Sequence, residues 1–568
     1  MIKISKVLFI LILTLPVFQG MQAQSSSKGK NGEVPKGWHL MDKEKDGYYG
    51  ISLNKAYDFI VSKKLKGKQV VVAIIDSGID TLHEDLKEII WHNPGEIPGN
   101  GIDDDKNGYI DDVYGWNFLG NKDGRNVEQD SYEGARVYHG LKDKYNKKNL
   151  NEESLTPEEK LEYEMWKKAK AAVIGSENEY IDLVELFQAV RIVKKQDSVL
   201  RKAMEKEEFT GNDLEKYEPA NQAERVAKNY LLSMMKSNNM MEITNKEFVE
   251  GFDGFAKAEE KKGEQREKAP IAYRSKIVGD NENDINDKNY GNNNVMVSND
   301  ASEHGTHVSG IIAAVRKNGK GMDGVADNVR IMMLRAVPDG DEHDKDIALA
   351  IRYAVDNGAK VINMSFGKSF SPNKKWIDEA VQYADTKGVL LVHAAGNDHK
   401  NIDSTDNFPN AININTNTKA SNWITVGANS STDGVTAYFS NFGKSQVDVF
   451  APGTGIYATF PGGNVYRSLD GTSMASPVVA GTAAFLLSYF PYLTPQQVKL
   501  CIEKSAQAPG VKVKKPGTDQ MVELSEISKT GGLLNAYEAV KVAASLQPGA
   551  IPEIKKKTRK PTLKNKRG

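Results

Sequence analysis

The stretch Gln69-Val-Val-Val-Ala-Ile-Ile-Asp-Ser-Gly78 decides the fold of this chain. An apolar run without polar alternation is typical of a strand that is buried on both faces of a parallel sheet. Asp76 follows the run at once, so it lies at the carboxyl end of the predicted strand. Functional groups of open α/β sheets gather at that edge. The stretch therefore predicts a central strand that ends in a functional carboxylate.

Similar patterns continue along the rest of the chain. Strands are predicted at residues 329–337, 360–364, 389–393 and 423–426, and helices at 305–315, 344–357 and 375–387. Strands that alternate with helices predict a parallel sheet covered by helices on both faces. The expected fold class is a three-layer α/β fold.

Two further motifs supply chemistry that matches the carboxylate. They are His304-Gly-Thr-His307 and Gly471-Thr-Ser473-Met-Ala-Ser-Pro477. A carboxylate, an imidazole and a hydroxyl are the parts that turn a weak alcohol into a nucleophile. Taken alone, the serine could cap a helix and the aspartate could close a turn. The two histidines do not match a metallopeptidase helix, which places its histidines four residues apart around a glutamate.

Together, the three motifs make the chain resemble the subtilisin-like serine peptidases. The order Asp, His, Ser is the subtilisin order, whereas chymotrypsin-like enzymes run His, Asp, Ser and α/β-hydrolases run Ser, Asp, His. The resemblance covers about residues 34–124 and 276–546. It implies that Ser473 is the nucleophile, that His304 is the general base and that Asp76 orients His304.

The resemblance also implies an oxyanion hole and a substrate groove. Val392-His-Ala-Ala-Gly-Asn397 ends a predicted strand with an amide, which matches the subtilisin-like oxyanion motif. Asn397 is expected to donate to the oxyanion together with the backbone N–H of Ser473. The stretch Ser365-Phe366-Gly367 resembles the segment that pairs with an extended substrate by strand addition.

An acidic loop at residues 103–112 predicts a structural calcium site. Oxygen-bearing groups recur at alternate positions, and the candidate ligands are Asp103, Asp105, Asn107, the carbonyl of Tyr109, and Asp111. The twelfth position is Tyr114 and not glutamate, so a complete EF-hand is absent. The alternative is a solvated acidic turn. We expect the chemistry itself to require no cofactor.

The segment 125–275 is predicted to be a mainly helical insertion. More than two hundred positions separate Asp76 from His304, where the subtilisin-like pattern has a few tens. The segment is rich in lysine and glutamate, and Thr156-Pro157-Glu-Glu159 combines a capping box with proline at the first helical position. It could be a decoration on the surface, a lid or autoinhibitory element near the cleft, or an arm that binds a partner.

The N-terminus carries features that are typical of an exported protein. Lysines and a short apolar run predict a signal peptide at residues 1–23, followed by the first part of the peptidase domain at 24–124. The second part is expected at 276–546, and a basic tail at 547–568 is expected to be disordered. The predicted location is periplasmic or extracellular.

Net charge, apolar runs and the cysteine count limit the classes of partner and covalent cross-link that are expected. The formal net charge of −1 argues against a nucleic-acid partner. After the signal peptide no uninterrupted apolar run is long enough for a transmembrane anchor. Cys501 is the only cysteine, so no intrachain disulfide can form, and its surroundings predict a buried residue in an amphipathic helix.

Two functions follow from these observations. The first is a secreted endopeptidase that cuts polypeptides through an acyl-enzyme. The second is a binding or scaffold protein in which the site is idle and the segment 125–275 engages a partner. The intact set of three motifs favours the first function, and covalent labelling of the serine discriminates between them.

Overall fold

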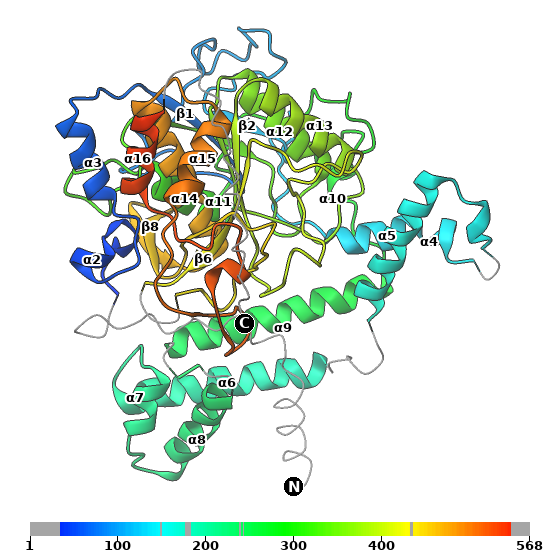
Figure 1. Cartoon of the computed structure of the whole chain (residues 1–568). Coiled ribbons are helices and arrows are strands. Elements are labelled where there is room, and N and C mark those ends of the chain that lie inside the picture. The colour runs from blue at the N-terminus through cyan, green and yellow to red at the C-terminus, as the bar shows by residue number, and fades with distance from the viewer. Residues whose placement is uncertain are drawn as a thin grey trace, which may run out of the picture.

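A seven-stranded parallel sheet forms the centre of the molecule (Figure 1). The structure is a computed structural model that describes residues 34–147, 150–175, 183–237, 240–241, 244–431 and 435–546. The predicted signal peptide and basic tail lie outside these residues. The strand order is β2-β3-β1-β4-β5-β6-β7. The strands are β1 (Val70–Asp76), β2 (Gly115–Asn117), β3 (Val329–Arg335), β4 (Val361–Met364), β5 (Leu390–Ala394), β6 (Trp423–Asn429) and β7 (Val449–Pro452).

Successive residues of β1 face two different hydrophobic cores. Val72 and Ile74 pack in one core, whereas Ala73 and Ile75 pack in the other. The first core is covered by α3 (Leu53–Ser62), α11 (Asn299–Ala313), α14 (Thr472–Tyr489), α15 (Pro495–Ser505) and α16 (Ala536–Ser545). The second core is covered by α12 (Asp344–Asp356) and α13 (Lys374–Thr386). Helices on both faces of a parallel sheet confirm the predicted three-layer α/β fold.

The predicted strands and helices agree with the structure to within a few residues, apart from the start of α11. This helix begins at Asn299, six residues before the predicted start, because the side chain of Ser298 accepts a hydrogen bond from the Ala301 N–H and caps the helix. Several short strands were not predicted. They are β2, β7 and the two hairpins, β8 (Ile456–Phe460) with β9 (Val465–Leu469) and β10 (Val513–Lys514) with β11 (Met521–Val522).

Helices occupy most of the described part of the segment 125–275. They are α4 (Glu133–Tyr145), α5 (Pro157–Ile174), α6 (Leu183–Met204), α7 (Gly211–Lys216), α8 (Gln222–Ser237), α9 (Asn245–Glu267) and α10 (Tyr273–Ile277). The predicted capping box at Thr156 is present, with Pro157 as the first helical residue. Helices α6 to α9 share a separate core that includes Leu186, Leu231 and Phe252.

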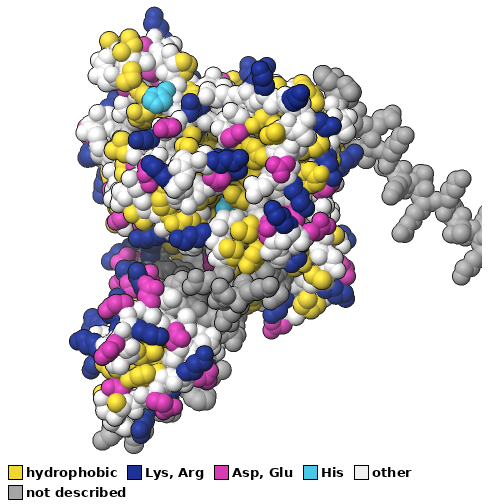
Figure 2. Space-filling view, turned by 90° about the vertical axis from the view of Figure 1, so that its left-hand side faces the viewer, with side chains coloured by type: hydrophobic (Ala, Val, Ile, Leu, Met, Phe, Trp, Pro, Cys, Tyr) yellow, Lys and Arg dark blue, Asp and Glu magenta, His cyan; other side chains and the backbone are white. Residues whose placement is uncertain are grey.

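The described helices of the predicted insertion, apart from α10, extend from one side of the molecule. Helix α9 lies along the lower side of the body, α6 to α8 form a lobe below it, and α4 and α5 project on the right of Figure 1. In Figure 2 the surface of this lobe carries basic and acidic side chains side by side. The carboxyl-terminal ends of α5 and α9 line the same cavity as Ala394, the last residue of β5.

Cys501 is fully buried in α15, as predicted, and burial raises the pKa of its thiol to about 12. A thiol with that pKa stays protonated and packs as a small apolar group. Within the described residues, none of the helices has the length and apolarity needed to cross a membrane.

Candidate active site

A carboxylate and an imidazole meet at the carboxyl end of β1. Asp76 is the last residue of β1, and its Oδ1 lies 2.8 Å from Nδ1 of His304 in the second turn of α11. The helix approaches the strand closely at Gly305, where an added Cβ would lie only 2.1 Å from the carbonyl oxygen of Gly78. A side chain at this position would push α11 away, so the glycine of the motif keeps the two groups within hydrogen-bond distance.

The surroundings of His304 favour its protonated form more than water does. Burial lowers the pKa of His304, but the charge of Asp76 and its hydrogen bond outweigh burial, so the net pKa lies above the usual 6.5. The side chain is still 38% exposed, which leaves the ring accessible from the solvent side. His307 differs, because it is fully buried on the backbone carbonyl of Arg467 and burial lowers its pKa to about 4.

Ser473 lies in the first turn of α14 and is tied to Ser365. Its hydroxyl donates to the Ser365 carbonyl at 3.1 Å, and the Ser365 hydroxyl donates to the Ser473 carbonyl at 3.0 Å. Helices α11 and α14 pack against each other. Among the described residues no hydrogen bond joins Ser473 to His304. Because the Ser473 hydroxyl has a single proton, it can donate to His304 only when its bond to Ser365 is broken.

Asn397 is held against the beginning of the same helix. Its Oδ1 accepts hydrogen bonds of 2.9 Å from both the backbone N–H and the hydroxyl of Thr472. These bonds use the oxygen of the amide and leave its NH₂ group for other partners. A methyl group placed on Gly471 would lie 3.5 Å from the Ser473 nitrogen and 3.6 Å from Asn397 Nδ2. The two N–H donors therefore flank the same space.

A cavity of about 560 Å³ opens beside these groups. Ser473, Asn397, Phe366 and Gly367 line it, and Ser365 lies next to it through its bonds to Ser473. The structure thus brings together the residues that sequence predicts for the nucleophile, the oxyanion donor and the substrate groove. It also adds residues of the insertion to the wall of the cavity, which sequence did not predict.

Comparison with known proteins identifies the family. The sequence model of the Subtilase family matches residues 67–526. This range includes β1, β5, α11 and α14, which carry the motifs of the site, and also the segment 125–275. The chain belongs to the subtilase family. The family assignment and the seven-stranded sheet agree, because the motifs that carry the resemblance lie at the carboxyl ends of β1 and β5 and in α11 and α14.

Several curated subtilases are similar to this chain over part of its length. The thermophilic serine proteinase of Bacillus sp. (strain AK1) is 45% identical over 190 residues, which are 33% of this chain and 43% of that protein. Subtilisin DY of Bacillus licheniformis is 38% identical over 209 residues, 36% of this chain and 71% of that protein. Thermitase of Thermoactinomyces vulgaris is 36% identical over 243 residues, 42% of this chain and 74% of that protein. The chain thus covers less than half of the first relative.

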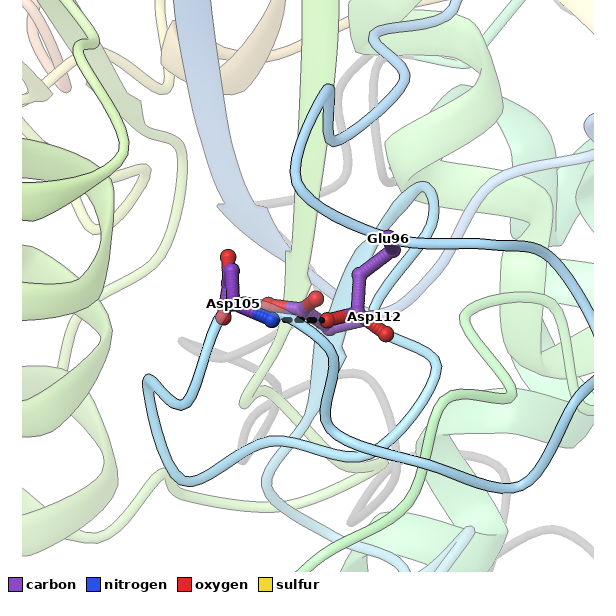
Figure 3. Close-up of side chains that lie close together, drawn as sticks. All are labelled: Glu96, Asp105 and Asp112. Atoms are coloured by element: carbon purple, nitrogen blue, oxygen red, sulfur yellow. Dashed lines mark hydrogen bonds between the residues drawn. The ribbon is translucent and has the colours of Figure 1, made fainter.

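The acidic loop of this subtilase gathers a different set of carboxylates from the predicted one. Carboxylate oxygens of Glu96, Asp105 and Asp112 all lie within 4.8 Å of one another (Figure 3). Glu96 also accepts a hydrogen bond from the backbone N–H of Asp105 at 3.2 Å. Glu96 and Asp112 are buried, and burial raises the pKa of both carboxyl groups. Of the predicted ligands only Asp105 belongs to this group.

The other predicted ligands have separate contacts in the loop. The carboxylate of Asp111 accepts from the backbone N–H groups of residues 99, 100 and 101, and that of Asp103 accepts from those of residues 107 and 108. Asn107 donates to Asp105 and to Asp112, and the ring of Tyr109 packs on Trp116. Asp103 and Asp111 thus hold the loop together, and the three carboxylates that face one another are Glu96, Asp105 and Asp112.

Proposed function

We propose that this subtilase is an exported endopeptidase that cuts polypeptides through an acyl-enzyme on Ser473. The observation that carries the proposal is the 2.8 Å contact between Asp76 and His304 at the end of β1, where α11 packs against α14, the helix with Ser473 in its first turn. Membership of a family of serine peptidases supports the same chemistry. Export rests on the predicted signal peptide at residues 1–23.

In the proposed first step the hydroxyl oxygen of Ser473 attacks the substrate carbonyl carbon while His304 Nε2 takes the hydroxyl proton. Asp76 accepts from Nδ1–H, which leaves Nε2 unprotonated, and stabilises the imidazolium that forms. His304 then gives the proton to the leaving nitrogen as the C–N bond breaks. Water, activated by His304 in the same way, hydrolyses the ester and restores Ser473.

The Ser365 carbonyl is the acceptor that the Ser473 hydroxyl must leave. A substrate that pairs with residues 365–367 as an added strand would offer its own backbone N–H to this carbonyl. Competition for the carbonyl would release the Ser473 hydroxyl to turn toward His304. Substrate binding and activation of the nucleophile would then be linked through one backbone oxygen.

Two donors would stabilise the negative oxygen of the tetrahedral intermediate. They are Nδ2 of Asn397 and the backbone N–H of Ser473, which flank the same space. Ser473 also lies in the first turn of α14, where the free N–H groups and the helix dipole favour negative charge. Thr472 fixes the amide of Asn397 before the reaction starts, so little reorganisation is needed.

A fluorophosphonate probe tests the proposal directly, because it labels only an activated serine. We expect one label per chain, on Ser473, and no label in the Ser473→Ala variant. A chain that stays unlabelled although it is folded would favour the scaffold function, in which the site is idle.

We expect kcat/KM for a neutral peptide to fall as the pH drops through the pKa of His304. Asp76 holds this pKa above 6.5, and only the neutral imidazole can take the proton of Ser473. Activity is therefore present above the pKa and lost below it. A pH profile of kcat/KM measures this acid limb. A midpoint at or below 6.5 would show that Asp76 does not stabilise the imidazolium in the free enzyme.

We further propose that calcium stabilises the protein through Glu96, Asp105 and Asp112. Three carboxylates this close repel one another, and oxygen ligands are those that calcium prefers. Without calcium, the raised pKa values of Glu96 and Asp112 should make the free energy of unfolding fall as the pH rises through them. Bound calcium should weaken this dependence and raise the melting temperature.

Melting curves with calcium and with a chelator provide the measurement. The double variant Glu96→Gln with Asp105→Asn should lose the calcium response. The matched double variant Asp103→Asn with Asp111→Asn should melt at a lower temperature but keep the calcium response. The two carboxylates that it replaces accept hydrogen bonds only from backbone N–H groups. The reverse pattern would support the ligands predicted from sequence, and an unresponsive wild-type protein would rule out stabilisation by calcium.

A further inference from the structure

The insertion completes the cavity beside Ser473. Three of its helices contribute residues to the wall, each at one end of the helix. The start of α4 contributes Gly134 and Ala135, the end of α5 contributes Ala172 and Val173, and the end of α9 contributes Gln265 and Arg266. A substrate side chain that enters this cavity from Ser473 therefore meets atoms of the insertion.

A buried ion pair joins the start of α4 to the segment that follows the proposed substrate groove. Lys368 follows Phe366 and Gly367 in the chain, and its Nζ lies 2.8 Å from Oε2 of Glu133 at the start of α4. Arg136 on the same helix binds the same carboxylate at 2.7 Å. Lys368 is 1% exposed and Glu133 6%, and removing one partner of such a pair leaves a costly unpaired charge. The start of α4 is thus held in place beside the groove.

Contacts at the other helices hold the rest of the wall. Lys168 on α5 lies 2.5 Å from Asp406, which also lines the cavity. The end of α9 is joined to the end of α5 by the guanidinium of Arg266, whose Nε donates to the carbonyl of Val173 at 3.1 Å. His139 on α4 binds the carbonyl of Gln265 at 2.7 Å. These bonds orient Arg266 along the cavity wall.

Arg266 differs from the other charged residues that line the cavity. Lys368 is paired with Glu133, Asp406 with Lys168, and Lys400 with Asp398. Asp341 accepts a hydrogen bond from the backbone of Glu133, and burial raises its pKa. Within the described residues, no carboxylate lies within ion-pair distance of Arg266. Among these residues its two terminal nitrogens have no hydrogen-bond partner, so within the described part of the chain they can bind a ligand.

We propose that the insertion is a specificity element and that Arg266 binds an acidic side chain of the substrate, on the acyl side of the scissile bond. A guanidinium presents two parallel N–H groups that match a carboxylate. The acyl side is assigned because two of its proposed binding elements line the cavity. They are Asn397, which would donate to the carbonyl oxygen of the acyl group, and residues 366–367, which would pair with the substrate backbone. The inference rests on the proposed peptidase function and names the substrate class for the same site.

Matched peptides test the inference. Each set carries Glu, Gln or Lys at one of the four positions on the acyl side of a fixed cleavage site, and kcat/KM is measured with the full chain. At one position we expect wild type to prefer Glu over Gln by about tenfold or more, a preference that shrinks at high salt. Arg266→Gln should abolish the preference, and Arg266→Glu should reverse it in favour of Lys.

Arg225→Gln is the matched control, because Arg225 is an exposed arginine on α8 of the same insertion and does not line the cavity. It should keep the wild-type ratio of Glu to Gln. Equal rates for Glu and Gln at all four positions, or the same ratio in wild type and Arg266→Gln, would overturn the inference and leave the peptidase function standing. A wild-type protein that cuts no peptide and takes no fluorophosphonate label would overturn both.

Discussion

Replacing Ser473 by alanine is expected to lower kcat by about 10⁶, which is the loss known for the nucleophile of subtilisin itself, carried over to this member of the family. Without the hydroxyl no acyl-enzyme can form, and Asp76 and His304 have no group to activate. The proposed oxyanion donors and the proposed substrate groove are left intact, so peptides should still bind with KM little changed. The measurement is the rate of peptide hydrolysis by purified protein.

A second serine on the same helix provides the control. Ser488 is fully buried in α14, and its hydroxyl has no hydrogen-bond partner within the described residues. Ser488→Ala should therefore keep both activity and fluorophosphonate labelling. The melting temperature of Ser473→Ala should stay close to that of wild type, because the hydroxyl makes one hydrogen bond to Ser365. Activity of Ser473→Ala within tenfold of wild type, in protein free of contaminating peptidase, would exclude Ser473 as the nucleophile.

The central fold was predictable because its signals are local. The run at residues 69–75 is apolar on both faces, and the strands at 329–337 and 360–364 show the same property, as strands inside a parallel sheet must. Strands β2 and β7 are only 3 and 4 residues long, too short for periodicity to distinguish them from loops. None of the residues of β9 is buried, so this strand lacks the alternation of buried and exposed residues that would indicate it.

Site residues could be predicted where a short motif determines their position. They could not be predicted where the fold brings together residues from separate segments. Asp76 ends a strand and Gly305 lets α11 approach, and both features are visible in short stretches of sequence. The acidic cluster is different, because Glu96 comes from a turn before the loop and no fixed spacing relates it to Asp112. The regular spacing in the loop instead predicts Asp103 and Asp111, whose carboxylates accept hydrogen bonds from backbone N–H groups.

The contribution of the insertion to the cavity depends entirely on tertiary structure. Arg266 lies far along the chain from Ser473, at the end of a helix that is rich in lysine and glutamate. The ion pair of Glu133 with Lys368 joins two segments that are 235 positions apart. No periodicity or spacing in the sequence indicates such a pair, so the sequence alone could not show that residues of this segment line the cavity.

Replacing Asn397 by alanine is expected to lower kcat by roughly 10²–10³ with little change in KM, which is the size of the effect known for the corresponding amide of subtilisin. The carbonyl oxygen of a bound substrate carries only a partial negative charge, whereas the oxygen of the tetrahedral intermediate carries a full negative charge. A donor at Nδ2 therefore stabilises the transition state more than the bound substrate. Steady-state kinetics with a small peptide separate the two effects.

Asn397 also has a structural contact, so alanine alone does not isolate the donor. Its Oδ1 accepts from the N–H and hydroxyl of Thr472, and alanine removes this anchor at the start of α14. Asn397→Asp keeps an oxygen acceptor for Thr472 but has no NH₂ group, and its charge repels the oxyanion. If the donor matters, Asn397→Asp should lose at least as much kcat as Asn397→Ala. Near wild-type kcat in Asn397→Asp would assign the residue to holding Thr472, and a raised KM with unchanged kcat in Asn397→Ala would make it a ground-state contact.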